Sequence, residues 1–162
     1  MKNHLLLAFS LLFFSINLSA QQRVAQPVCD DAIMLAQADS IKAALGLQGF
    51  RVVKEAAVPM ESQYEMPVIV PLTQGGWYQF VFIADQGSRL AEVRMFDWNE
   101  KQVVYQKKQP GLIDNNIIFY NYIPKFSEYH MIKPVQINKK KKKNLWGYVI
   151  LLKKEGAAQP PQ

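Results

Sequence analysis

Cysteine and histidine are scarce in this sequence, and the motifs of common enzymes are absent. Cys29 is the only cysteine, and His4 and His130 are the only histidines. One cysteine excludes an internal disulfide, and a single histidine beyond the N-terminal segment excludes a multi-histidine metal site. No Gly-x-Ser-x-Gly elbow accompanies His130. The sequence therefore predicts a protein that is not an enzyme, holds no metal or cofactor, and buries its lone thiol.

The acidic residues also lack the spacing of a catalytic pair or a calcium loop. Glu92 and Asp97 differ in strand parity, so they would face opposite sides of a sheet. Asp97 and Glu100 flank a turn, where acidic residues are common. Asp114 is followed by two asparagines rather than by the alternating acids of a calcium loop. We interpret these residues as turn formers, which disfavours glycoside hydrolysis and calcium binding.

No apolar run has the length of a membrane-spanning helix, but residues 1–20 have the three parts of a secretory signal. Lys2 precedes an apolar run of 12 residues, Leu5 to Ile16, and a short segment then ends at Ser19-Ala20. A transmembrane helix needs about 20 such residues. We expect cleavage before Gln21 and export to the periplasm, the outer-membrane surface or the medium. The start Gln21-Gln22 resembles that of many exported proteins of the Bacteroidota.

The chain after the signal has the size and composition of one globular domain. Removal of 20 of the 162 residues leaves 142, close to the most common domain size. A hydrophobic content of 49% with 12% aromatic residues excludes a disordered chain. We expect a linker at 21–28, a single domain at 29–154 and a flexible tail at 155–162.

One helix is expected, at the start of the domain. Apolar residues at spacings of four, three and four predict a helix over 29–45 whose apolar face is made by Met34, Ala38, Ile41 and Leu45. Gly46 stands where a left-handed residue would end this helix.

Everything after this helix has the pattern of short strands separated by turns. The clearest strand, Trp77 to Ala84, is apolar on both faces and should be central in a sheet. About eight strands are expected, beginning near Phe50, Met66, Trp77, Leu90, Gln102, Ile117, Tyr129 and Leu145. No helical pattern separates them, which excludes parallel βαβ units. The sequence predicts a mainly β fold, an antiparallel β-sandwich or jelly roll with one N-terminal helix.

The order of elements between Pro67 and Leu152 resembles a known family. The order begins with an apolar strand, Val68–Leu72, and a glycine turn before an aromatic strand, Gly75–Phe80. A strand-turn-strand, Met95–Val103, comes next, and a closing pair around a proline turn follows at Ile118–Tyr120 and Ser127–Ile132. This order resembles the β-sandwich modules of the pre-peptidase C-terminal type that are appended to secreted bacterial enzymes. It covers roughly half of the chain, and Glu128 stands where a glycine usually precedes the tyrosine. The resemblance implies a non-catalytic interaction module without identifying a ligand.

Positive charge is concentrated in one short run. The formal net charge of +6 falls to +5 without Lys2. Five consecutive lysines equal this charge: Lys139, Lys140, Lys141, Lys142 and Lys143. Adjacent like charges cannot pack together, so this run is expected in a solvated loop. Near Trp146 it would bind an envelope protein, an anionic lipid or lipopolysaccharide, each lysine adding about 1 kcal/mol near an anionic surface. The alternative is a hairpin loop that keeps a sheet edge soluble. Nucleic acid is not an expected partner of an exported protein.

Exposed aromatic residues offer a second function. Trp98, at a strand end beside a turn, and Trp77 would stack on sugar rings if they are exposed, although aromatics on alternating strands usually belong to the core. We therefore expect a non-catalytic interaction module of the bacterial cell envelope that docks to a partner protein or an anionic surface through its lysine-rich loop. The alternative is a carbohydrate-binding module for polysaccharide.

Overall fold

One helix and eight strands make up the part of the chain that the structure, a computed structural model, describes: residues 29–108, 116–140 and 144–156. In chain order they are α2 (Ala32–Leu47), β1 (Phe50–Met60), β2 (Val68–Leu72), β3 (Tyr78–Ala84), β4 (Ser88–Phe96), β5 (Gln102–Lys108), β6 (Ile117–Tyr122), β7 (Glu128–Asn138) and β8 (Leu145–Lys154). The leading helix and the eight strands agree with the prediction. The expected signal, the linker, most of the tail and Asp114 lie outside the described residues.

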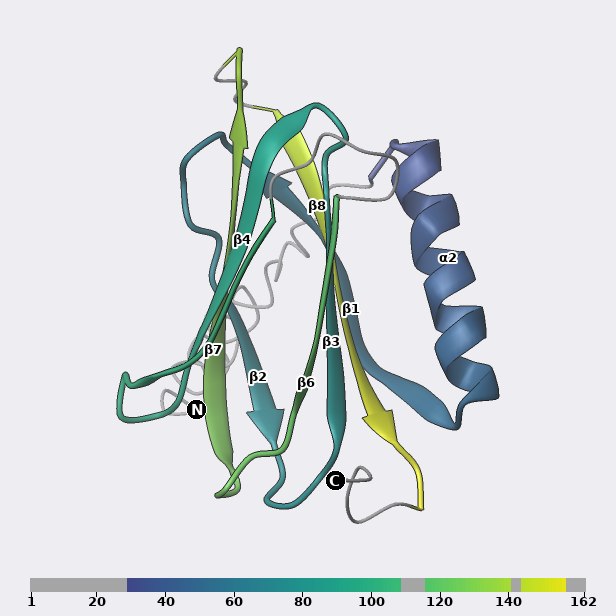
Figure 1. Cartoon of the computed structure of the whole chain (residues 1–162), viewed down its shortest axis with the longest axis vertical. Coiled ribbons are helices and arrows are strands. Elements are labelled where there is room, and N and C mark those ends of the chain that lie inside the picture. Colours follow the sequence, from purple (N-terminus) through teal and green to yellow (C-terminus); the bar gives the residue numbers. More distant parts are fainter. Residues whose placement is uncertain (1–28, 109–115, 141–143, 157–162) are drawn as a thin grey trace, which may run out of the picture.

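The strands form two four-stranded antiparallel sheets, which Figure 1 shows as the two layers of a sandwich. One sheet has the order β1-β8-β3-β6 and the other the order β2-β7-β4-β5. The strands pair from the ends of the chain inward, β1 with β8, β2 with β7, β3 with β6 and β4 with β5. This nested pairing is that of a jelly roll, a two-sheet fold of eight strands. The predicted fold class, a mainly β antiparallel sandwich with one N-terminal helix, is confirmed.

Strand β3 is buried on both of its faces. Phe80 and Phe82 point into the core between the sheets and are at most 1% exposed. Val81 and Ile83 point to the outer side of the same sheet and are fully buried there. Burying each such side chain contributes about 1.5–3 kcal/mol. Because β3 pairs with β6 on one side and β8 on the other, its predicted central position is confirmed.

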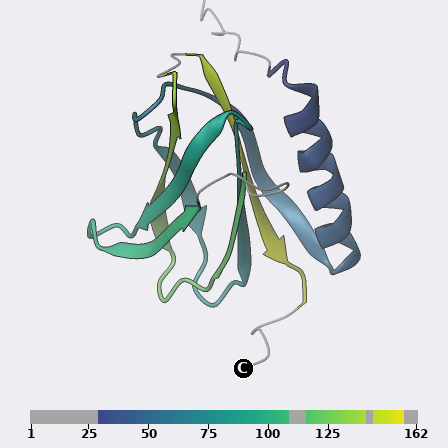
Figure 2. The ribbon, with the colours of Figure 1, turned by 45° about the horizontal axis from the view of Figure 1, so that its top comes forward.

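Helix α2 covers the outer face of the β1-β8-β3-β6 sheet, as Figure 1 and Figure 2 both show. Asp31 is its N-cap, because the carboxylate accepts hydrogen bonds from two backbone N–H groups of the first turn, at 3.0 and 3.1 Å. The side chains that pack on the sheet are those of the predicted apolar face, Met34, Ala38, Ile41 and Leu45. No helix in the described ranges is long and apolar enough to cross a membrane.

The predicted C-cap at Gly46 is wrong. Gly46 lies inside the helix, and Gly49, with φ of +79°, adopts the left-handed conformation instead. The helix continues to Leu47, whose side chain is 93% exposed. The apolar pattern of the buried face therefore ends before the helix itself. At the other end Cys29 is buried, as expected, and this burial raises the pKa of its thiol.

Strand β1 begins at Phe50, as predicted, and ends at Met60. It is an edge strand, where the missing N–H of Pro59 does not interrupt a sheet. A register shift lies between Val52 and Lys54, and the Lys54 ammonium donates a hydrogen bond of 2.8 Å to the carbonyl oxygen of Ile69 on β2. These features protect the edges of both sheets on this side of the sandwich.

The outer face of the β2-β7-β4-β5 sheet has no helix over it in the described part of the chain, as Figure 2 shows. Its centre is charged: Arg94 pairs with Glu92 and with Glu65, the latter at 3.0 Å, and Lys133 pairs with Glu65 at 3.1 Å. Tyr105 donates a hydrogen bond of 3.3 Å to Glu92. Ile69 and Tyr129, elsewhere on this face, are more than half exposed.

The two glycines Gly147 and Gly46 should respond in opposite ways to alanine. A Cβ on Gly147 would lie 2.7 Å from the Met60 sulfur and 2.8 Å from the buried Phe82 ring, whereas nothing lies within 4 Å of one on Gly46. Gly147→Ala should lower the free energy of unfolding by about 1–3 kcal/mol through overpacking. Gly46→Ala should raise it by about 0.5–1 kcal/mol, because it lies in a helix interior. Urea unfolding of both variants checks this, and a shift of the same sign in both would contradict the packing described.

Alkaline pH should destabilise the fold through Tyr120. Burial, and then the neighbouring Tyr122, raise the pKa of Tyr120 well above its usual value of 10.0. Above about pH 10 the Tyr120 phenol loses its proton in the unfolded chain but keeps it in the folded chain. The free energy of unfolding present below that pH therefore falls by up to about 1.4 kcal/mol per pH unit. Urea unfolding from neutral to alkaline pH measures the slope. Tyr120→Phe should flatten it, whereas Phe80→Leu, which alters a ring 4.8 Å away and keeps the phenol, should not.

Candidate functional site

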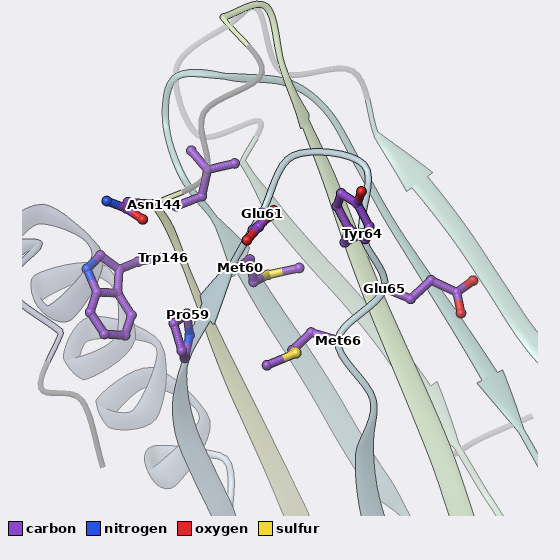
Figure 3. Close-up of a pocket in the computed structure, with 9 residues that line it drawn as sticks. Pro59, Met60, Glu61, Tyr64, Glu65, Met66, Asn144 and Trp146 are labelled. Carbon is purple, nitrogen blue, oxygen red and sulfur yellow. The ribbon is translucent and has the colours of Figure 1, made fainter. Parts of the chain in front are cut away.

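A pocket of about 720 Å³ opens beside the edge strand β1, at the end of the sandwich where β7 ends and β8 begins (Figure 3). We call it the β1–β8 pocket. Its walls come from three segments: the end of β1, the connection to β2 and the start of β8. The lining residues are Pro59, Met60, Glu61, Tyr64, Glu65, Met66, Asn144, Leu145 and Trp146. Segments about 80 residues apart in the sequence therefore form a single site.

The connection that forms one wall is fixed to β7 by hydrogen bonds. The backbone N–H of Gln63 donates to the carbonyl oxygen of Gln136 at 2.9 Å, and that of Met66 donates to Pro134 at 3.2 Å. The N–H of Asn138 donates to the Ser62 hydroxyl at 2.9 Å. These bonds hold the wall in place without a regular strand, which is the arrangement expected of a preformed ligand pocket.

The side chain of Gln136 fixes the other walls from inside the core. It is fully buried, and its Nε2 donates to the carbonyl oxygen of Trp146 at 2.9 Å and contacts the Met60 sulfur at 3.3 Å. Its Oε1 accepts from the Asp85 N–H at 2.9 Å and from the Ser88 hydroxyl at 2.8 Å. Gln136 was not among the predicted site residues, because a glutamine in a strand gives no signal of burial.

The interior of the β1–β8 pocket is apolar and adaptable. Met66 projects into it, and its flexible thioether can fit ligands of different shape, while the almost fully buried Met60 also lines it. The Trp146 ring is half-buried, and its indole N–H donates to Asp30 at 3.0 Å, which fixes its orientation. Glu65 points away from the pocket in Figure 3, toward its partners Arg94 and Lys133.

The structure places part of the lysine run beside this pocket. Lys139 and Lys140 are exposed in the turn that follows β7, and the Lys140 N–H donates to the Asn138 side chain at 2.8 Å. Asn138 is the residue that binds Ser62, next to Glu61 in the pocket wall. The remaining lysines, 141–143, lie outside the described residues, and the sequence then continues directly into Asn144 of the pocket.

The two tryptophans considered for sugar stacking lie on different sheets. Trp77 packs on the helix-covered side, 5.3 Å from the Phe50 ring, and its N–H donates to Asn121 at 3.2 Å. Trp98 lies in the β4–β5 turn, 69% exposed, and its ring centroid is 6.3 Å from that of Tyr129 on β7. Parity along β7 would have placed Tyr129 on an outer face, but no pattern of residues indicated that Trp98 would meet it.

His130 points into the sandwich. It is 1% exposed, its Nε2 lies 3.1 Å from the Tyr122 hydroxyl, and Glu128 lies 3.8 Å from the same nitrogen. Burial, followed by the charges of Glu128 and Asp97, raises the pKa of Tyr122. This group links the two sheets, because His130 belongs to β7 and Tyr122 to β6. Within the described ranges, no three His, Cys, Asp or Glu side chains are grouped so that they could hold a metal ion.

No protein family and no curated protein matches the sequence. Among solved structures, the chain of tomato aspermy virus has 9% identity and a TM-score of 0.37, over 98% of this chain and 100% of that one. The Gx strain of infectious bursal disease virus has 10% identity and a TM-score of 0.35, over 68% of this chain and 34% of that one. The VP2 subviral particle of that virus has 13% identity and a TM-score of 0.34. The chain spans about a third of the length of these bursal disease virus chains, and the jelly-roll assignment rests on its own strand order.

Proposed function

We propose that this protein is an exported, non-enzymatic binding module whose ligand is an amphiphile with an anionic head group, such as an acidic lipid of the bacterial envelope. The observation that carries the proposal is the apolar β1–β8 pocket beside the lysine turn. The apolar part of the ligand would enter the pocket, and the head group would meet Lys139 and Lys140. The signal-like residues 1–20 and the resemblance to secreted sandwich modules support export and a binding role.

The size and lining of the pocket fit such a ligand. Its volume of about 720 Å³ falls within the range of about 300–1,000 Å³ that is usual for small-molecule sites. Two methionines, a proline, a leucine and a tryptophan supply apolar surface, which favours a chain or ring over a polar ligand.

The charges near the mouth favour an anion. The Glu65 carboxylate is paired with Arg94 and Lys133, so it adds little net negative charge. Glu61 is the other acid in the lining, and two exposed lysines, Lys139 and Lys140, follow Asn138, which binds the neighbouring Ser62. Opposite charges attract at the surface over about a Debye length, so the attraction should weaken with salt.

Titration with amphiphiles that share one chain tests the head-group part of the proposal. Decyl phosphate, decyl maltoside and decyltrimethylammonium, each below its micelle concentration, are compared by isothermal titration calorimetry. At low salt decyl phosphate should bind about thirtyfold more tightly than decyl maltoside, because two lysines near an anion contribute about 1 kcal/mol each, about 2 kcal/mol together. Lys139→Ser/Lys140→Ser should remove this preference. The control Lys101→Ser/Lys107→Ser, with the same change in net charge on exposed residues, should keep it.

A charged residue placed in the pocket tests the apolar part. Met66→Glu should weaken binding of all three probes at least tenfold, whereas Val53→Glu adds the same charge to an exposed position outside the pocket and should have no such effect. Equal binding of the three probes by the unchanged protein would contradict an anionic head group. Binding that survives Met66→Glu would contradict the pocket, and capture of an acidic protein without amphiphile binding would favour a protein partner.

A further inference from the structure

A second surface of the protein exposes large apolar side chains at the other end of β7. Trp98 is 69% exposed, Ile69 is 56% exposed and Tyr129 is 55% exposed, and they line a cleft of about 240 Å³ on the open sheet face. Tyr129 stands near the start of β7, whereas Asn138, beside the β1–β8 pocket, ends it. Exposed clusters of this kind usually mark a binding site.

The turn that carries Trp98 is fixed before any ligand arrives. One carboxylate oxygen of Asp97 accepts hydrogen bonds from the N–H groups of Asn99 and Lys101, both at 2.9 Å. The Asp97 N–H donates to the carbonyl oxygen of Lys101 at 3.0 Å, and Glu100 has a φ of +60°, which a non-glycine residue adopts only when its surroundings impose it. A rigid turn lowers the entropy lost when a ligand binds to its side chain.

The geometry of the cleft limits the shape of its ligand. The rings of Trp98 and Tyr129 are inclined to each other by 47°, so one flat surface cannot cover both. A single chain of rings, whose successive units can rotate, can place one unit on each aromatic side chain. This geometry excludes a flat crystalline surface as the ligand.

The chemistry of the cleft limits the ligand further. Its polar lining includes the carboxylates of Asp97 and Glu100, which accept hydrogen bonds and repel anions. A sugar ring offers apolar C–H groups on its face and hydroxyl donors around its edge, so it can contact the aromatic rings and the carboxylates together. A neutral sugar matches both features, whereas an acidic sugar would be repelled.

We propose that the cleft of Trp98 and Tyr129 is a second binding site, which binds a single chain of a neutral polysaccharide independently of the β1–β8 pocket. Asp97 and Glu100 accept hydrogen bonds from its hydroxyl groups. Because no lysine of the described part of the chain lines this cleft, its affinity should vary little with salt, unlike that of the amphiphile site.

Soluble oligosaccharides test this site on the intact protein. Cellohexaose, xylohexaose and mannohexaose serve as neutral probes, hexagalacturonate as an anionic probe and hexalysine as a basic peptide, all measured by isothermal titration calorimetry. At least one neutral probe should bind. Trp98→Ala and Tyr129→Ala should each weaken it at least tenfold, without lowering the melting temperature, because both side chains are exposed. Phe126→Ala removes an aromatic side chain that is 65% exposed outside the cleft, and it should bind as the unchanged protein does.

The two sites can fail separately. Trp98→Ala should leave decyl phosphate binding unchanged, and Met66→Glu should leave oligosaccharide binding unchanged. The proposal is overturned if no neutral probe binds at millimolar concentration, if hexagalacturonate or hexalysine binds in their place, or if Trp98→Ala retains the affinity of the unchanged protein.

Discussion

The buried amide of Gln136 is the interaction on which both the sandwich and its pocket depend. Gln136 belongs to β7 in one sheet, and its Nε2 donates to the carbonyl oxygen of Trp146 in the other. Its Oε1 accepts from Asp85 and Ser88 where the chain passes from β3 to β4, and Met60 completes its contacts. An amide offers two donors and two acceptor positions, and all are used here. Because a buried amide without partners costs about 1–3 kcal/mol, the sheets cannot slide past each other without losing this set of bonds.

The sequence was most informative where burial acts on a single element. Strand β3 is apolar on both faces because one face meets the opposite sheet and the other meets α2, so its central position could be inferred from its residues alone. The helix face was inferred for the same reason. Boundaries were less predictable: β1 runs through Pro59 because an edge strand tolerates proline, and Gly46 suggested the end of α2, although an exposed Leu47 continues it.

The candidate sites could be inferred only in part, because each is made by segments that the sequence keeps far apart. Trp146 and the lysine run lie close together in the sequence, so their proximity could be predicted from it. The apolar pocket could not be predicted, since residues near 60 meet residues near 145 only through the pairing of β1 with β8. Alternation along a strand predicts the face of a side chain but not the sheet that carries the strand. For that reason Trp77 and Trp98 were considered together, although α2 covers the sheet of one and leaves the sheet of the other open.

This asymmetry of the sandwich explains where binding surfaces can exist. On the β1-β8-β3-β6 sheet the helix buries Val81, Ile83 and Ile150, so that sheet gains stability from these outward residues, while Phe119 on the edge strand β6 stays 42% exposed. The β2-β7-β4-β5 sheet keeps Ile69, Trp98 and Tyr129 exposed, a cost in hydration that folding alone does not require. Strand β7 connects this exposed group at its start with the pocket wall at its end. One rigid strand therefore holds two chemically different surfaces at a fixed separation, so a single domain could bind an acidic amphiphile and a neutral polysaccharide together. Such a module would attach one component of the envelope to another without an enzymatic step.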